Sequence, residues 1–302
     1  RKFIKFRIEH NFRHKFLQRL WDEKIDTHIL IGNHDIYFRN TNKVNAIKEL
    51  CTTPDGVNEP WIYEEAKVVD FDGLSILMLP WINPENEASS LELAKTAEAD
   101  ICMGHLDLNN FAMNDAMKQT NGHDKSIVKK FEKVYSGHFH HKSDDGQVFY
   151  LGNQYEITWS DYNNQKYFHI LDTETREITP VRNPITMFKK IVYDDSKTDY
   201  NAVDVSEYEK KFIKLIVLKK DDLYMFDKFI DKLQSIETYE LKIAESFEEY
   251  MGESVEDEKI SLEDTTQLLD SYVDAVETDL DKDHIKVELR KLYTEAQNLE
   301  VV

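Results

Sequence analysis

The sequence predicts an α/β (α+β) fold built in layers, and three observations support this prediction. Short hydrophobic segments of strand length recur between residues 27 and 173. Segments with helical spacing stand between some of them, and loops rich in Asn, Asp and Gly separate the elements. Since strands with helices between them favour a sheet covered by helices, we expect a layered domain.

The expected elements begin with an amphipathic helix over residues 12–21. Its apolar residues recur at spacings of three and four: Phe12, Phe16, Leu17, Leu20 and Trp21. Further helices are predicted over residues 42–50 and 89–99. Short hydrophobic runs predict strands at 27–31, 66–71, 74–81, 100–105, 133–140, 147–153 and 166–173.

The character of the chain changes after residue 184, and we predict three parts. Residues 1–184 form the first domain. Residues 185–250 form a small α/β unit with a strand at 212–218, a helix at 225–236 and a strand at 241–247. Residues 251–302 begin as a polar, acidic linker and continue as two helices, the first with a capping arrangement of Ser261 and Asp264.

Composition excludes several classes of protein. Of the 302 residues, 41% are hydrophobic and 32% are charged, which is typical of a globular chain and not of a disordered or membrane protein. The longest nearly unbroken apolar run, Leu74–Ile82, is too short to cross a bilayer. Two cysteines, Cys51 and Cys102, are too few for a disulfide framework, so we expect a cytoplasmic protein without membrane association.

The net charge of -20 argues at first against a nucleic-acid partner, because phosphate binding depends on clustered Lys and Arg. The charge is uneven, however. Residues 1–50 hold 11 Lys and Arg against 6 Asp and Glu, whereas residues 251–302 hold 5 against 15. Because the acidity is concentrated in the tail, DNA remains a possible partner of the rest of the chain.

Three predicted strands end in histidine motifs: GNHD at 32–35, GH at 104–105 and GHFH at 137–140. Glycine allows the backbone to turn at the carboxyl end of a strand, where open α/β sheets place their ligand sites. A single such histidine is better explained by structural hydrogen bonding. Three motifs in this order favour a metal site, since imidazole and amide donors suit Mn, Zn or Fe. On an extended segment, His138 and His140 would point the same way.

These motifs resemble the second half of the calcineurin-like metallophosphoesterase signature. Within that superfamily the chain is most similar to SbcD-type double-strand-break repair nucleases, particularly the recombination endonuclease nuclease subunits of T4-like phages. The supporting stretches are MGHLDLNNF (103–111), VYSGHFHHKS (134–143) and YLGNQYEITWSD (150–161). The resemblance implies a four-layer αββα sandwich, a small α/β capping domain that grips DNA, and C-terminal helices that dock on the coiled coil of an SbcC-type ABC ATPase.

The resemblance also implies roles for single residues. Asn33, His105 and His138 would hold one of two divalent metal ions, and His140 would help hold the other; Mn²⁺ is the expected metal, with Mg²⁺ as the alternative. His34 would donate a proton to the leaving oxygen or stabilise charge. Asp35 would orient His34 or its loop.

Other residues are candidates for contacts with partners. Arg39, Tyr155 and Trp159 could touch DNA, although a salt bridge for Arg39 and core packing for the two aromatic residues are alternatives. The apolar faces of the two tail helices are candidates for docking the ATPase, with a plain helical hairpin as the alternative. These faces are represented by Leu269, Tyr272, Val273, Leu289, Leu292 and Tyr293.

One departure from the family is clear. The Asp-x-His and GDxxD motifs that open the family signature do not occur before Ile29. We therefore expect this polypeptide to bind metals weakly and to cleave poorly.

The favoured function is a nuclease subunit that hydrolyses phosphodiester bonds at double-stranded DNA ends, as a homodimer within a heterotetramer, in the cytoplasm of a host cell if a phage encodes it. One alternative is a metallophosphoesterase acting on phosphoproteins or small phosphodiesters. Another is a non-catalytic scaffold that binds DNA and the ATPase.

Overall fold

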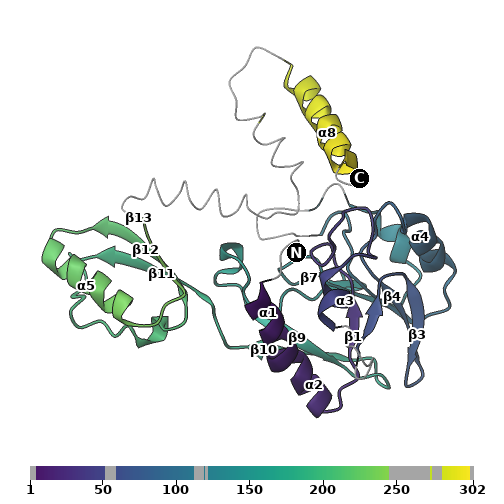
Figure 1. Ribbon diagram of the computed structural model, residues 1–302, viewed down its shortest axis with the longest axis horizontal. Helices are drawn as coiled ribbons and strands as arrows, with labels where there is room; N and C mark the ends of the chain where they lie inside the picture. Colours follow the sequence, from purple (N-terminus) through teal and green to yellow (C-terminus); the bar gives the residue numbers. More distant parts are fainter. Residues whose placement is uncertain are drawn as a thin grey trace. The chain divides into compact units, whose positions relative to one another are not determined.

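The computed structural model describes residues 5–51, 59–111, 119, 122–244, 273 and 281–299 (Figure 1). It is a mixed α/β structure in two compact units. The first unit contains the chain up to Asn153 and Phe168–Val181, and the second contains Gln154–Tyr167 and most of the chain from Arg182 onward. The mixed α/β class is therefore confirmed.

A six-stranded sheet forms the centre of the first unit. Its strands are β3 (Lys67–Phe71), β4 (Leu74–Leu79), β5 (Ile101–Gly104), β6 (Lys133–Ser136), β8 (Val148–Tyr150) and β7 (Ser143–Asp144), in that order across the sheet. The four inner strands are parallel to one another, and β3 and β7 are antiparallel to their neighbours. All but the short β7 lie within the predicted strand segments.

Each face of this sheet has its own hydrophobic core, because neighbouring side chains of a strand point to opposite faces. Along β4, Leu77 and Leu79 pack on one face with α4 (Glu87–Thr96) and the 3₁₀ helix η2 (Lys125–Val128). Ile76 and Met78 pack on the other face, with residues of β1 (His28–Leu30) and β2 (Trp61–Tyr63).

The hairpin of β9 (Lys166–Leu171) and β10 (Ile178–Asn183) contributes Leu171 and Ile178 to the core on the β1 side. The six-stranded sheet is therefore covered by helices on one face and by strands on the other. The arrangement as a four-layer αββα sandwich remains a prediction.

The amino-terminal helix runs from Phe6 to Asp22, as α1 (Phe6–Asn11), a π-helical segment η1 (Phe12–Leu17) and α2 (Gln18–Asp22). It confirms the helix predicted over residues 12–21 and extends it. Leu17 is fully buried on its inner side, whereas Phe6 and Phe16 remain exposed.

The helix expected from residue 42 begins later, as α3 (Ala46–Cys51). Asn42 donates its side-chain amide to the carbonyls of Glu64 and Trp81, which fixes it as a loop residue. The side-chain oxygen of Asn45 accepts the Lys48 amide at 2.8 Å, as a helix cap does. The helix therefore starts after Asn45 because the two asparagines hold the preceding loop.

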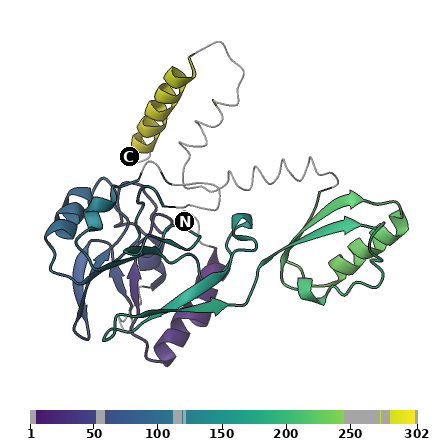
Figure 2. The same ribbon diagram turned by 180° about the vertical axis from the view of Figure 1, so that it is seen from behind.

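The second unit contains three parallel strands, β11 (Phe188–Asp194), β12 (Phe212–Lys219) and β13 (Glu240–Ala244), in sequential order (Figure 2). Helix α5 (Leu223–Ser235) covers one face, capped by Asp222, whose carboxylate accepts the Met225 amide at 3.0 Å. Strands β12 and β13 and helix α5 were predicted, but β11 was not. The stretch 195–211 between β11 and β12 contains the 3₁₀ helix η4 (Ser206–Tyr208).

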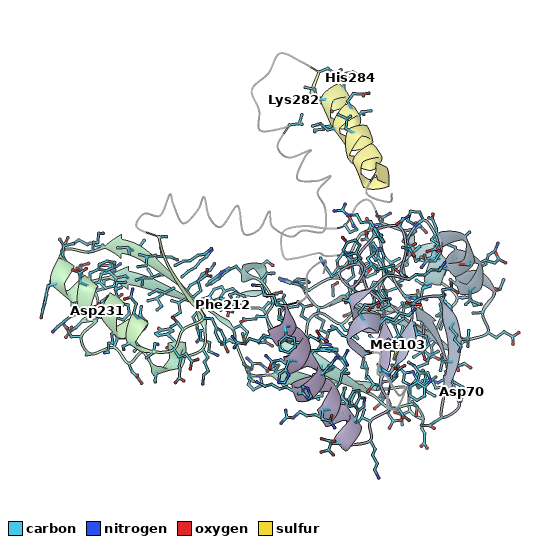
Figure 3. All side chains as sticks on the ribbon, in the orientation of Figure 1. Asp70, Met103, Phe212, Asp231, Lys282 and His284 are labelled. Atoms are coloured by element: carbon cyan, nitrogen blue, oxygen red, sulfur yellow. The ribbon has the colours of Figure 1, made fainter. Side chains whose placement is uncertain are left out.

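On the other face of the three-stranded sheet, the segment 154–167, which contains the 3₁₀ helix η3 (Trp159–Asp161), packs near Phe188 and Lys214. The ring of Trp159 lies 4.8 Å from that of Phe188, which in turn stacks on Phe212, labelled in Figure 3. The Glu156 carboxylate accepts the main-chain N–H of Phe188 at 3.0 Å. These contacts explain why the segment belongs to the second unit, although the sequence placed it before the boundary at residue 184.

Only part of the tail is described. Helix α8 (Lys282–Leu299) corresponds to the second predicted tail helix. Leu269 and Tyr272, predicted on the first tail helix, lie outside the described residues, whereas Val273 is helical and buried. Among the helices that can be described, none is long and apolar enough to cross a membrane.

Candidate active site

The carboxyl ends of β4, β5 and β6 meet at one edge of the six-stranded sheet, because these strands are adjacent and parallel. His105 directly follows β5, whose Met103 is labelled in Figure 3, and His138 follows β6 by one glycine. Trp81 stands just beyond β4, and its main-chain N–H donates to the Ile31 carbonyl at 2.8 Å. That bond brings the end of β1, and with it Asn33, to the same edge.

Three predicted site residues come together at this edge. His105 Nε2 lies 2.9 Å from Asn33 Oδ1, and the rings of His105 and His138 are 5.2 Å apart, centroid to centroid. The indole of Trp81 lies against both rings, at 6.1 Å and 5.2 Å. Gathering Asn33, His105 and His138 therefore requires the ends of three separate strands, as the sequence pattern predicts.

Gly32 is required by the packing of the site. A Cβ atom at this position would lie 2.7 Å from Cε1 and 2.9 Å from Nδ1 of His105, closer than real Cβ contacts come. The imidazole thus passes directly over the backbone of Gly32. The glycine before Asn33 therefore provides space for His105 as well as a turn.

His138 departs from the geometry that the sequence suggested. Residues 137–142 form no strand, and His138 has a left-handed φ of 85°. The expectation of an extended segment through His138 and His140 is therefore wrong. His140 is partly buried in the same loop, and its carbonyl accepts the Asn153 amide at 3.1 Å. His141, the next residue, is buried.

The two ring nitrogens of His138 have different surroundings. Nε2 lies 3.7 Å from Asp107 Oδ1, and Nδ1 is buried without a hydrogen-bond partner in the described part of the chain. The Gln119 amide donates to the same Asp107 oxygen at 2.6 Å. Burial raises the pKa of Asp107, but the hydrogen bonds and positive charge of its neighbours, His138 first, outweigh burial and hold the pKa below its usual range.

Asp107 was not singled out from the sequence. A signal was available, because it is the first carboxylate after the β5 strand end, two positions beyond His105.

Asp35 closes the GNHD turn. Its carboxylate accepts the Gly32 amide at 2.8 Å, and its own amide donates to the Gly32 carbonyl at 3.1 Å. Burial raises the pKa of Asp35, although the Gly32 hydrogen bond opposes this shift. His34 is partly buried beside it.

The surroundings of the candidate DNA and partner contacts differ from residue to residue. Arg39 is exposed in the first unit, and Tyr155 is 53% exposed in the second. Trp159 packs on Phe188, with Lys214 Nζ 4.8 Å from its ring centroid, which favours the packing alternative for this residue. On α8, Leu289 is partly buried and Leu292 is 59% exposed; the side chain of Tyr293 is outside the described part.

The donor set can be compared with what a metal ion requires. Within the described ranges, no group of three or more His, Cys, Asp or Glu side chains is arranged to hold a metal. The predicted set differs from such a group because one of its three donors is an amide oxygen. Two imidazoles and an amide suit divalent transition metals, and the buried, unpaired Nδ1 of His138 is a donor that a metal would satisfy. The residues therefore fit one metal ion.

The sequence of the chain was compared with those of known proteins and protein families. No family model matches the chain. The chain is 30% identical over 288 residues to "Exonuclease subunit 1" of Enterobacteria phage T4, an alignment that covers 94% of this chain and 81% of the phage protein.

Proposed function

The chain belongs to the family of exonuclease subunit 1 of Enterobacteria phage T4, and on that premise we propose that it is the nuclease subunit of a complex that processes DNA double-strand breaks. The observation that carries the proposal is the convergence of Asn33, His105 and His138 at one sheet edge. Their donor atoms are those expected of a metal-dependent phosphodiesterase.

The proposed chemistry is hydrolysis of DNA phosphodiester bonds with two divalent metal ions. Asn33, His105 and His138 would hold one ion and His140 would contribute to the other, with Mn²⁺ favoured over Mg²⁺ because imidazole is a poor ligand for Mg²⁺. When bound, the metals supply an activated water and neutralise charge on the phosphate.

The protein side chains have their own parts in this proposal. His34 would give a proton to the leaving oxygen, and Asp35 would hold the loop that presents it, through its bond to the Gly32 amide. Trp81 covers His105 and His138 with an apolar wall that keeps water from one side of the site.

The relative's name includes the word subunit, and we propose that this chain also works in a complex. An SbcC-type ABC ATPase that controls access to DNA ends is the proposed partner, and two copies of the chain would pair within a heterotetramer. Among the described candidates, Leu292 of α8 is exposed and could contact the ATPase, and Tyr155 and Arg39 are exposed and could contact DNA.

A Mn²⁺-dependent assay on linear double-stranded DNA, with and without the ATPase, tests the proposal. His34→Ala should lower the cleavage rate by roughly 10²- to 10⁴-fold, the usual contribution of a general acid, with DNA affinity unchanged. The exposed His284 of α8 provides a matched control, and His284→Ala should cleave at the wild-type rate. Equal rates for wild type and His34→Ala would contradict the proposed role.

A scaffold function is the second candidate, favoured by the lack of a three-member His, Cys, Asp or Glu group in the described residues. It predicts DNA binding without metal-dependent cleavage in the same assay. A phosphatase acting on small substrates would instead hydrolyse aryl phosphates faster than DNA.

A further inference from the structure

Asp107 lies beside a buried histidine at the site and is held in place from several sides. The backbone before it is fixed by Leu106, whose N–H donates to Ser136 Oγ at 2.9 Å and whose carbonyl accepts the Tyr150 hydroxyl at 2.9 Å. The backbone after it is fixed by Leu108, whose N–H donates to the same hydroxyl at 3.0 Å. Asp107 therefore sits between two residues that are anchored to the sheet.

The loop that follows also closes around Asp107. The His123 amide donates to the Asp107 carbonyl at 2.7 Å, and a Cβ atom at Gly122 would lie only 2.4 Å from that carbonyl oxygen. On the carboxylate, Gln119 Nε2 donates to Oδ1. The position of the carboxylate is thus set by the fold and does not depend on His138.

His138 is held as firmly. Its ring is packed against those of Trp81, His105 and Phe139, with centroids about 5 Å away, and only 8% of the residue is exposed. Of its two nitrogens, one is next to the Asp107 carboxylate and the other has no partner in the described part of the chain. A neutral imidazole carries one proton, and the nitrogen beside a carboxylate is the one that retains it.

We propose that Asp107 is a positioning residue, which keeps the proton of His138 on Nε2 and so leaves the Nδ1 lone pair of His138 free to bind a metal ion. With a metal ion on Nδ1, the arrangement would be a carboxylate–histidine–metal triad, in which the carboxylate, 3.7 Å from Nε2, fixes both the tautomer and the ring orientation. The inference rests on the proposed function only in that the site takes a metal.

The tautomer of His138 can be measured without metal or DNA. The metal-free 302-residue chain, labelled with ¹⁵N-histidine, is studied by two-bond ¹H–¹⁵N correlation at a pH of about 8, above the ordinary imidazole pKa of about 6.5. The His138 signals are assigned from their loss in His138→Gln. We expect the Nε2–H form in the wild type and in Asp107→Asn, whose amide oxygen still accepts, and a shift toward the Nδ1–H form in Asp107→Ala.

The affinity for Mn²⁺ provides the second measurement. Loss of such an outer partner weakens metal binding by about 10- to 100-fold, so Asp107→Ala should bind Mn²⁺ more weakly by that factor, while Asp107→Asn stays within about threefold of wild type. Glu98 is an exposed carboxylate of the same unit, and Glu98→Gln is the control that should change neither readout.

Two outcomes would overturn the proposal. One is an Nδ1–H tautomer in the wild type, or a tautomer that Asp107→Ala leaves unchanged. The other is equal loss of Mn²⁺ affinity in Asp107→Asn and Asp107→Ala, which would make the carboxylate itself a ligand. The tautomer is measured without metal or DNA, so the two proposals can fail separately. The inference about Asp107 can fail while the nuclease assay succeeds, and the nuclease assay can fail while the tautomer is as expected.

Discussion

His105 Nε2 lies 2.9 Å from the side-chain oxygen of Asn33, a residue 72 positions earlier in the chain. The contact joins the ends of β5 and β1, and it is possible only because Gly32 leaves room for the imidazole. The stability of this corner and the chemistry proposed for it therefore depend on the same few residues.

Gly32→Ala should destabilise the chain. The added methyl would lie 2.7 Å from His105 Cε1, and overpacking of this kind costs about 1–3 kcal/mol of unfolding free energy. Urea unfolding followed by circular dichroism measures the change. In a chain that already carries His105→Ala, the added methyl has no imidazole to contact. Gly32→Ala should therefore lower the unfolding free energy by at least about 1 kcal/mol less in that chain than in wild type. An equal loss in both would show that His105 is not the cause.

Asp161→Ala should strongly destabilise the second unit. Asp161 is fully buried, accepts the amides of Ile157 and Thr158, and lies 2.7 Å from Lys166 Nζ, whose side chain is 2% exposed. Removing one member leaves a buried unpaired charge, which costs about 3–5 kcal/mol. Thermal and urea unfolding, followed by circular dichroism, measure the loss.

The matched control is the exposed ion pair of Lys43 and Glu85 in the first unit. Glu85→Ala should leave the unfolding free energy nearly unchanged, because water screens such pairs. If Asp161→Ala costs no more than this control, the buried pair does not hold the segment 154–167 in place.

Tyr150→Phe should weaken the support of the site. The buried hydroxyl bridges the carbonyl of Leu106 and the amide of Leu108, and its removal leaves both groups without that partner, at a cost of about 1–3 kcal/mol. Tyr224 is 70% exposed, and Tyr224→Phe should leave the unfolding free energy unchanged. A Tyr150→Phe variant as stable as the control would contradict the bridging role.

Stability should also fall in alkali because of Tyr150. Burial raises the pKa of Tyr150 above its usual value near 10, so the folded chain keeps a proton that the unfolded chain loses. The favourable contribution is present below a pH of about 10 and declines above it, by up to about 1.4 kcal/mol per pH unit. Measured by urea unfolding between about pH 9 and pH 11, the unfolding free energy should decline more steeply with pH in wild type than in Tyr150→Phe. Equal slopes in the two proteins would contradict the role of Tyr150 in the alkaline loss of stability.

Much of the first unit was predictable because its strands are short hydrophobic runs, three of which lead into glycine and histidine. The GNHD, GH and GHFH motifs located the ends of β1, β5 and β6. Parallel pairing of β5 and β6 placed His105 and His138 at one edge, and the hydrogen bond from Trp81 to Ile31 brought Asn33 beside them. For the two histidines this inference needed only the rule that parallel strands end at one edge. The position of Asn33 did not follow from that rule, because β1 pairs with β2 in a separate sheet.

Other features depend on contacts that no local pattern reveals. The turn at His138 places a non-glycine residue at φ 85°, a conformation stabilised by its packed surroundings and invisible in the spacing of two histidines. Strand β11 was missed because Lys189 and Lys190 interrupt its apolar pattern. Segment 154–167 joins the second unit through Glu156 and Trp159, whose partners follow in the chain only from residue 187.

The most direct test of the central claim is the Mn²⁺ dissociation constant of the 302-residue chain, measured by titration with electron paramagnetic resonance detection. If Asn33, His105 and His138 hold a metal ion, Asn33→Ala, His105→Ala and His138→Ala should each weaken binding by at least about tenfold, equivalent to about 1.4 kcal/mol, with His284→Ala unchanged. Equal Mn²⁺ affinity in wild type and His105→Ala would contradict the claim.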